Sequence, residues 1–180
     1  TTYTLTATQT QSGCVATDAV VVTVNQQTPT ADAGLDGEKT CTQNSTGVQI
    51  GALAQTGQTY NWTPVTGLSA SGVANPIANP SSTTNYTLTV TNAATGCTST
   101  DQVLVSVNTS LPTASAGLDF TKTCVLNANG LAIGQTAVSG VSYSWSPSLG
   151  LSNAAVSNPT ANPSATTTYT LTATQANNGC

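Results

Sequence analysis

The stretch Thr84–Cys97, TNYTLTVTNAATGC, occurs three times in the chain and decides its architecture. It is matched by TTYTLTATQTQSGC at Thr1–Cys14 and by TTYTLTATQANNGC at Thr167–Cys180. The tyrosines and the terminal cysteines of the three copies are each spaced by 83 residues. A fixed, ungapped spacing is typical of a tandem array of one structural unit. Each copy alternates apolar residues with Thr, which predicts a β-strand with one buried face.

Other segments share the period-two alternation or the richness in β-formers that predicts strands. All the predicted strand ranges are Thr1–Gln9, Ala19–Asn25, Gly47–Gln55, Thr59–Thr63, Asn85–Val90, Gln102–Asn108, Gly130–Ala137 and Ser142–Ser146. The region Pro64–Ser82 is rich in turn residues, and its Asn-Pro steps favour loops or edge strands because Pro cannot donate to a β-ladder. No apolar stripe of helical period persists along the sequence. The sequence therefore predicts an all-β chain.

The 83-residue spacing divides the chain into three parts. Residues 1–28 are predicted to be the C-terminal hairpin of a truncated repeat, residues 29–111 a complete repeat, and residues 112–180 a repeat that lacks its last strand. About seven short strands with one central Trp are typical of an immunoglobulin-like sandwich. We therefore expect tandem immunoglobulin-like β-sandwich repeats of 83 residues. Their predicted core includes Trp62, Trp145, Tyr86 and Tyr169.

The Tyr-containing strand stands at both ends of the chain, and two explanations compete for this redundancy. A subunit that donates Ala19–Asn25 to complete a neighbouring sheet would be a donor-strand pilin. Such a subunit has no need of the Tyr strand at both ends. We therefore expect the chain to be a window from a longer, uninterrupted array.

The composition excludes several classes of function. Charged residues make up only 4% of the chain, and there are two basic residues, no His and a net charge of −4. Nucleic acid is a poor partner, because its phosphates require a cationic surface. No membrane insertion is expected, because no apolar run is long enough to span a bilayer. No enzymatic activity is expected, because a Ser or Thr nucleophile would lack the usual His base and Arg clamp.

The stretch Thr59–Asn108 contains a Y-x-W-x-P element, paired Asn-Pro steps and a Tyr strand that ends in Gly-Cys. Together with AGLD followed by Cys41 or Cys124, these motifs resemble the tandem Ig/PKD-like repeats of giant cell-surface proteins in Bacteroidota. That group includes the gliding adhesins exported by the type IX secretion system. The resemblance covers essentially the whole chain. It implies adhesion or fibre formation outside the cell.

The five cysteines form two sets with the 83-residue spacing: Cys41 and Cys124, and Cys14, Cys97 and Cys180. Pairing within repeats gives Cys41–Cys97 and Cys124–Cys180, and leaves Cys14 to a partner outside the sequence. Pairing across a junction, Cys14–Cys41 and Cys97–Cys124, is the alternative. We favour the pairs within repeats, because the far ends of successive sandwiches are well separated. Disulfides and few charges predict an extracellular, oxidising location.

No cofactor or metal is expected. A zinc site would need a C-x-x-C pair or His, and neither is present. Calcium is kept as an alternative at the carboxylates of Asp32, Asp36 and Glu38, although the next junction retains only Asp119. Asp36 and Glu38 are interpreted as part of a solvated turn.

Two other kinds of side chain could be modified covalently. Lys39 and Lys122 share the 83-residue register and are interpreted as solvated rather than as partners in isopeptide bonds. Glycan decoration is an alternative role for the Thr-rich faces and for the asparagines that begin N-x-S/T sequons, namely Asn44, Asn61, Asn85 and Asn108.

The sequence as a whole predicts a structural or adhesive segment of a long extracellular or cell-surface fibre. Its expected partners are neighbouring repeats of the same protein and identical chains in a filament. The alternatives are a glycan- or surface-binding module that uses the loops of Pro64–Asn79, and a donor-strand-assembled pilin subunit.

Overall fold

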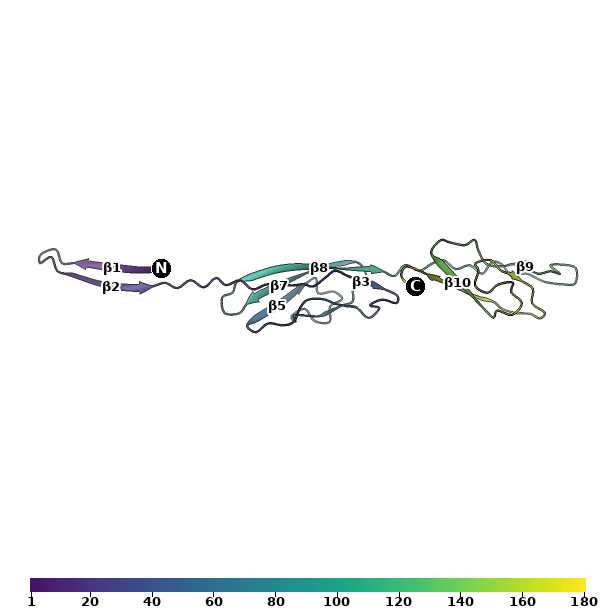
Figure 1. Ribbon diagram of the computed structural model, residues 1–180, viewed down its shortest axis with the longest axis horizontal. Helices are drawn as coiled ribbons and strands as arrows, with labels where there is room; N and C mark the ends of the chain where they lie inside the picture. Colours follow the sequence, from purple (N-terminus) through teal and green to yellow (C-terminus); the bar gives the residue numbers. More distant parts are fainter.

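The computed structural model describes residues 1–180 and is all-β, with twelve strands and no helix. Figure 1 shows three parts along one long axis, which we name the N-terminal hairpin (residues 1–28), the middle segment (29–111) and the last segment (112–180). The C-terminus lies where the middle and last segments meet. No helix long and apolar enough to cross a membrane is present. The all-β prediction is confirmed.

The N-terminal hairpin consists of β1 (Thr2–Thr8) and β2 (Val15–Val21), which pair antiparallel. The turn between them contains Gly13, which adopts a positive φ of 71°. Every residue of both strands is exposed. The prediction of a half-buried strand at Thr1–Gln9 is therefore wrong for burial, because no second layer packs on the hairpin.

The middle segment is built on a four-stranded sheet in the order β3-β8-β7-β5. Its strands are β3 (Gly37–Thr40), β5 (Gln58–Thr63), β7 (Thr84–Asn92) and β8 (Thr98–Asn108). The pairs β5–β7 and β7–β8 are antiparallel, whereas β3 runs parallel to β8. A second, two-stranded sheet joins β4 (Val48–Gln49) to β6 (Ile77–Ala78).

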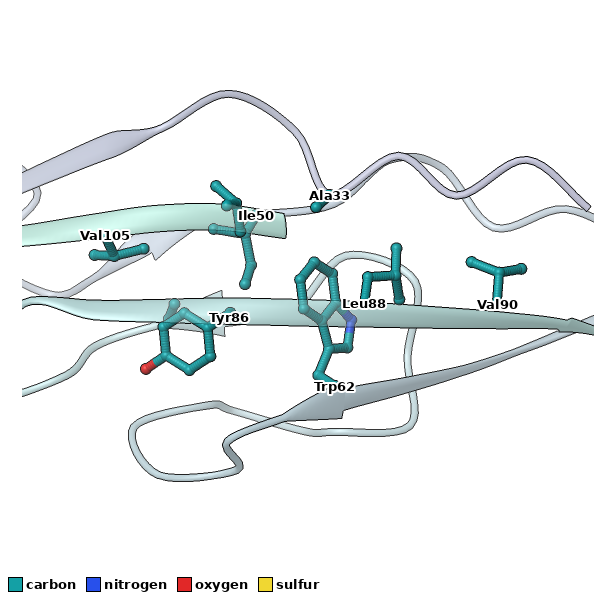
Figure 2. Packing of buried hydrophobic residues seen from close by; sticks show 9 residues of the cluster. Ala33, Ile50, Trp62, Tyr86, Leu88, Val90 and Val105 are labelled. Atoms are coloured by element: carbon teal, nitrogen blue, oxygen red, sulfur yellow. The ribbon is translucent and has the colours of Figure 1, made fainter. Parts of the chain in front are cut away.

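The core of the middle segment lies around Trp62, which is completely buried. In Figure 2 the Trp62 ring from β5 lies between Tyr86 and Leu88 of β7, with Ile50 facing it. The indole Nε1 donates to the carbonyl of Val73 at 2.9 Å, so the turn-rich region after β5 folds back over the core. The predicted core roles of Trp62 and Tyr86 are confirmed.

Tyr86 is also fully buried, and its hydroxyl donates to the carbonyl of Thr66 at 2.8 Å. Burial raises the pKa of Tyr86 above its usual value of 10.0, and the Thr84 hydroxyl offsets part of this rise. A phenol that has lost its water favours the neutral form, which is the form that donates to Thr66.

The last segment repeats several of these features with fewer strands. Its strands are β9 (Leu131–Ala132), β10 (Val141–Ser146), β11 (Thr160–Ala161) and β12 (Thr170–Gln175). β10 pairs with β12, and β9 pairs with β11. Its buried cluster is small: Ile133, Trp145 and Ala161. The Nε1 of Trp145 donates to the carbonyl of Val156 at 2.9 Å, as Trp62 does to Val73.

Tyr169 is only partly buried, so its predicted core role is wrong in degree. Its counterpart Tyr86 is covered by β8, since Tyr86 lies opposite the buried Val103. No strand covers Tyr169 in this way, because β12 has β10 as its only neighbour in the sheet.

Three strand predictions need correction. The range Ala19–Asn25 is wrong in its bounds, because the ladder with β1 spans Val15–Val21 and ends there. The range Gly47–Gln55 shortens to β4, and Gly130–Ala137 shortens to β9, because Gly51 and Gly134 each turn the chain at positive φ. The stretch after Asp36, interpreted as a solvated turn, is β3, whose backbone pairs with the far end of β8.

The two tyrosines permit a matched test of the buried hydrogen bond. Tyr86→Phe removes the hydrogen bond that the buried Tyr86 donates to the carbonyl of Thr66, so it should lower the free energy of unfolding by about 1–1.5 kcal/mol. Tyr169→Phe removes a similar bond to the carbonyl of Leu149, made at 2.7 Å at an exposed site, and should cost about 0.5 kcal/mol or less. Urea denaturation followed by tryptophan fluorescence measures both, and equal losses would contradict the burial of Tyr86.

Candidate functional site: the disulfide-linked junction

The candidate site lies at the junction of the middle and last segments, where three pieces of chain meet. They are the loop that follows β3, the C-terminal end of β8 and the turn that follows β12. β3 and β8 end together because Thr40 is opposite Asn108 in the parallel ladder. The chain leaves β8 directly toward the last segment, and the end of β12 returns to the same place.

A disulfide bond joins Cys41 of the middle segment to Cys180 of the last segment, and the two Cα atoms are 5.1 Å apart. This bond closes a loop with a sequence separation of 139 residues. In the chain-entropy model a loop of this length corresponds to a stabilisation of about 5 kcal/mol. The bond therefore links two segments that each have their own buried cluster.

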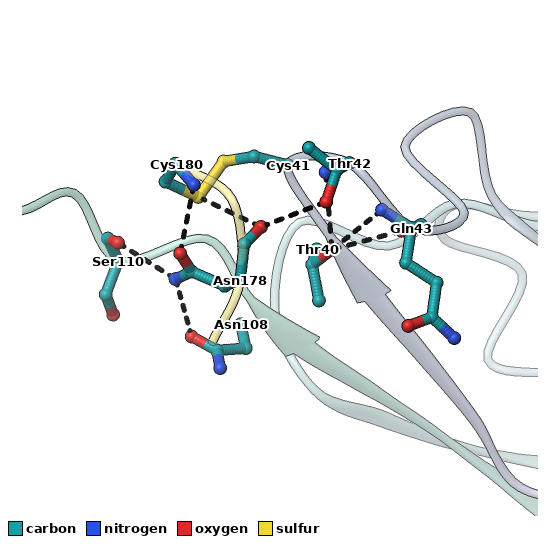
Figure 3. The surroundings of a disulfide bond; sticks show 8 residues. All are labelled: Thr40, Cys41, Thr42, Gln43, Asn108, Ser110, Asn178 and Cys180. Atoms are coloured by element: carbon teal, nitrogen blue, oxygen red, sulfur yellow. Dashed lines mark hydrogen bonds between the residues drawn. A yellow bond between two sulfur atoms is a disulfide. The ribbon is translucent and has the colours of Figure 1, made fainter. Parts of the chain in front are cut away.

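Asn178 organises the hydrogen bonds around the disulfide and is only 2% exposed. Its Nδ2 donates to Oδ1 of Asn108 at 3.0 Å and to the carbonyl of Ser110 at 2.9 Å. Its backbone carbonyl accepts from the N–H of Cys41 at 3.2 Å, and its Oδ1 accepts from the N–H of Cys180 at 3.0 Å. Figure 3 shows this one residue bridging both segments.

The loop that carries Cys41 is held by Thr40, which is buried at the end of β3. The Thr40 Oγ1 accepts from the N–H of Gln43 at 2.8 Å, and the Thr40 N–H donates to the Gln43 carbonyl at 2.8 Å. Asn44 adopts a positive φ of 49°, and its Nδ2 donates to the carbonyl of Glu38 at 2.7 Å. Cys41 is thus presented on a loop that its own segment fixes.

The predicted pairs Cys41–Cys97 and Cys124–Cys180 are wrong. Cys97 directly precedes β8, whereas Cys41 follows the residue opposite the end of β8. The length of that strand separates them by roughly 33 Å at about 3.3 Å per residue, far beyond the reach of a disulfide. Cys124 and Cys180 likewise belong to opposite ends of β12, because Cys124 lies near Tyr169.

The cross-junction alternative, Cys14–Cys41 and Cys97–Cys124, is not formed either. Cys14, Cys97 and Cys124 are free thiols in the structure. Cys14 and Cys124 are exposed, and Cys97 is partly buried.

The loop that carries Cys124 has the same hydrogen bonds as the loop that carries Cys41. The N–H groups of Val125 and Leu126 donate to Oγ1 of Thr123 at 3.2 and 2.8 Å. Asn127 has a φ of 52°, and its Nδ2 donates to the carbonyl of Thr121 at 2.8 Å. Cys124 is therefore presented as Cys41 is, but without a bonded partner.

The turn before Cys97 likewise docks on the linker that precedes the middle segment. The Oγ1 of Thr95 donates to the carbonyl of Gln27 at 3.1 Å, and Nδ2 of Asn92 donates to the same oxygen at 3.3 Å. Thr95 and Gln27 lie 83 residues before Asn178 and Ser110, which make the corresponding contact at the other junction.

The carboxylates serve as hydrogen-bond acceptors for the backbone. Asp36 Oδ1 accepts from the N–H of Leu104 at 2.8 Å, and Asp101 Oδ2 accepts from the N–H of Ala33 at 2.8 Å. Both bonds tie the chain before β3 to β8. No three His, Cys, Asp or Glu side chains gather, so the calcium alternative at Asp32, Asp36 and Glu38 finds no ligand cluster.

Both lysines donate to a backbone carbonyl, and Lys39 is partly buried, whereas Lys122 is exposed, in keeping with the solvated interpretation. Nζ of Lys39 donates to the carbonyl of Pro80 at 3.0 Å, and Nζ of Lys122 donates to the carbonyl of Pro163 at 3.1 Å. Lys39 therefore ties β3 to the second Asn-Pro step of the middle segment. Lys122 ties the corresponding stretch of the last segment to the second Asn-Pro step there.

Trypsin tests the disulfide directly, because the chain contains only two cleavage sites, Lys39 and Lys122. The resulting peptides are 1–39, 40–122 and 123–180. A Cys41–Cys180 bond links the second peptide to the third, whereas pairs within repeats would link none. Mass spectrometry without reduction should detect the linked species. Cys41→Ser should abolish this link, and Cys97→Ser, the control, should leave it.

Asn178→Ala should loosen the junction, because the variant leaves the backbone carbonyl of Ser110 and the side-chain Oδ1 of Asn108 without their donor. Hydrogen exchange at the N–H of Cys41 is expected to accelerate about tenfold or more, as the loss of such a buried bond costs about 1–3 kcal/mol. Asn177→Ala is the matched control, since Asn177 is exposed and makes no side-chain hydrogen bond. Equal acceleration in both variants would contradict the bridging role of Asn178.

Comparison with protein-family models and with curated proteins found no match for this chain.

Proposed function

We propose that the chain is a structural or adhesive segment of a long extracellular or cell-surface fibre, built from tandem immunoglobulin-like sandwich repeats of 83 residues. The observation that carries this proposal is the Cys41–Cys180 bond, which connects one segment to the next rather than closing a single segment. A covalent bond at this place resists separation of successive units along the long axis.

The presence of this disulfide supports an extracellular location, because structural disulfides persist in oxidising compartments. The scarcity of charge supports a structural role. With charged residues at 4% of the chain, neighbouring fibres would repel one another little. The partners in this proposal are neighbouring repeats and identical chains, with no catalytic activity.

The loop Pro64–Asn79, which the alternative binding function would use, supports the structural proposal. Ala74, Pro76 and Ala78 from this loop are buried, and its Val73 carbonyl accepts from Trp62. A loop that closes the core of its own segment has little freedom to reshape around a ligand. The resemblance to Bacteroidota surface repeats is in keeping with this role and remains part of the proposal.

Electron microscopy of the native assembly tests the function. We expect a continuous fibre whose density repeats once per 83-residue unit. Reduction should make the fibre bend more at each junction, because the disulfide is lost while the hydrogen bonds of the junction remain. Discrete globular particles in place of fibres would contradict the proposal.

A further inference from the structure

The turn that follows β12 contains Asn178-Gly179, one of two Asn-Gly steps in the chain. An Asn followed by Gly is prone to deamidation, because the backbone nitrogen of a residue without a side chain reaches the Asn side chain with little steric hindrance. The other step, Asn129-Gly130, lies in the loop that carries Cys124. The two steps belong to the same segment but have very different surroundings.

The turn itself requires the glycine. Gly179 adopts a positive φ of 70°, and a side chain at this position would collide with Thr42. The corresponding glycines of the two earlier copies have φ values of 71° and 72°. The residue before the glycine is not fixed in this way, because it is Ser12, Thr95 and Asn178 in the three copies. Only Asn carries an amide, so only the last copy can deamidate at this turn.

The junction holds the amide of Asn178 in place. The side chain makes the three hydrogen bonds described above, and the residue is only 2% exposed (Figure 3). The nitrogen that would attack it is engaged as well, because the N–H of Gly179 donates to the carbonyl of Gln175 at 2.8 Å. Deamidation therefore requires several hydrogen bonds of the junction to open together.

The disulfide adds a covalent restraint to these bonds. Ring closure between the Gly179 nitrogen and Cγ of Asn178 requires the backbone to rotate between the two residues. Cys180 follows Gly179 directly and is bonded to Cys41 of the middle segment. The backbone beside the reacting atoms is thus held at both ends, by the turn on one side and by the disulfide on the other.

Asn129 provides an internal reference. The residue is exposed, and its side chain makes no hydrogen bond. The N–H of Gly130 donates to the carbonyl of Asn127 at 2.9 Å, much as the N–H of Gly179 donates within its own turn. The two Asn-Gly steps therefore differ mainly in the burial and the hydrogen bonds of the Asn side chain.

We propose that Asn178 is a deamidation site that the junction protects, and that reduction of the Cys41–Cys180 bond releases it. The nitrogen of Gly179 attacks Cγ of Asn178 and forms a new C–N bond. The bond between Cγ and Nδ2 breaks, and Nδ2 leaves as ammonia with the proton of the Gly179 N–H. Water then opens the cyclic imide at either carbonyl carbon, which leaves Asp or isoaspartate at position 178. The net reaction is hydrolysis of one amide by one water molecule.

The product cannot rebuild the junction. A carboxylate is only an acceptor, so the carbonyl of Ser110 loses its donor and faces a negative charge in a buried site. Isoaspartate also lengthens the backbone before Gly179 by one carbon. Deamidation thereby turns a reversible loss of the disulfide into a permanent loss of the junction. This inference concerns the junction alone and does not depend on the proposed fibre function.

The test incubates the full chain near neutral pH, either oxidised or kept reduced with a phosphine, and follows deamidation at both steps by tandem mass spectrometry. In the oxidised chain Asn178 should deamidate about a hundredfold more slowly than Asn129, because each buried hydrogen bond that must open lowers the reactive population several-fold. Reduction should accelerate Asn178 by about tenfold or more and change Asn129 by less than about twofold.

Two serine variants separate loss of the bond from the presence of reductant. Cys41→Ser should accelerate deamidation of Asn178 without any reductant, as reduction does. Cys97→Ser is the matched control, because Cys97 is a free thiol, and it should leave the rate unchanged.

Three forms of residue 178 test the consequence for the junction. Thr95 already makes the corresponding contact at the other junction, so Asn178→Thr should keep the turn without an amide to lose. After long incubation in the reduced state and reoxidation, the unmodified chain should recover less of the Cys41–Cys180 link as deamidation proceeds. Asn178→Thr should recover the link equally at all times, and Asn178→Asp should recover little from the start.

Equal rates at Asn178 and Asn129 in the oxidised chain would overturn the inference, because the junction would then give no protection. A rate at Asn178 that ignores both reduction and Cys41→Ser would overturn the role of the disulfide. Full recovery of the link in Asn178→Asp would overturn the permanent loss of the junction. None of these results bears on whether the native assembly is a fibre.

Discussion

The two-sided pairing of β8 is the interaction on which the middle segment depends. β8 is hydrogen-bonded to β7 along one edge and to β3 along the other, and it places Val103 and Val105 over Tyr86 and the rest of the core. Asp36 and Asp101 fasten the chain before β3 to the same strand. The last segment has the sequence of the other strands without this one, and its buried cluster falls to three residues.

The strands with the clearest period-two alternation, such as Thr1–Gln9 and Asn85–Val90, are found, because alternation reflects a local property of the backbone. Burial is different, as the sequence TYTLT illustrates. It is fully exposed at β1 and partly buried around Tyr169, and the related TNYTLTV is buried on one face in β7. Whether an alternating strand buries its apolar face depends on the layer that covers it, which no local pattern contains.

The disulfide could be predicted only in part. The spacing of 83 residues separates the cysteines into two sets, and the bond does join one set to the other. The choice among partners depends on which strand ends meet in space, and the parallel pairing of β3 with β8 decides it by carrying Cys41 away from Cys97. A signal for the acceptor roles of Asp36 and Asp101 was present, because Asp36 and Asp119, and Asp18 and Asp101, share the 83-residue spacing.

The direction of β3 also determines how load would pass through the junction. A pull on the last segment reaches the middle segment at two points, the end of β8 through the chain and the end of β3 through Cys41. These strands are parallel neighbours in one sheet, so both are pulled along their length in the same direction. When the chain that enters before β3 is held, a pull on the end of β8 loads the β3–β8 ladder in shear, and the Cys41 bond passes part of this load directly to the backbone of β3. The disulfide therefore adds resistance by sharing the load between two strands, an effect that a bond within one segment would not produce.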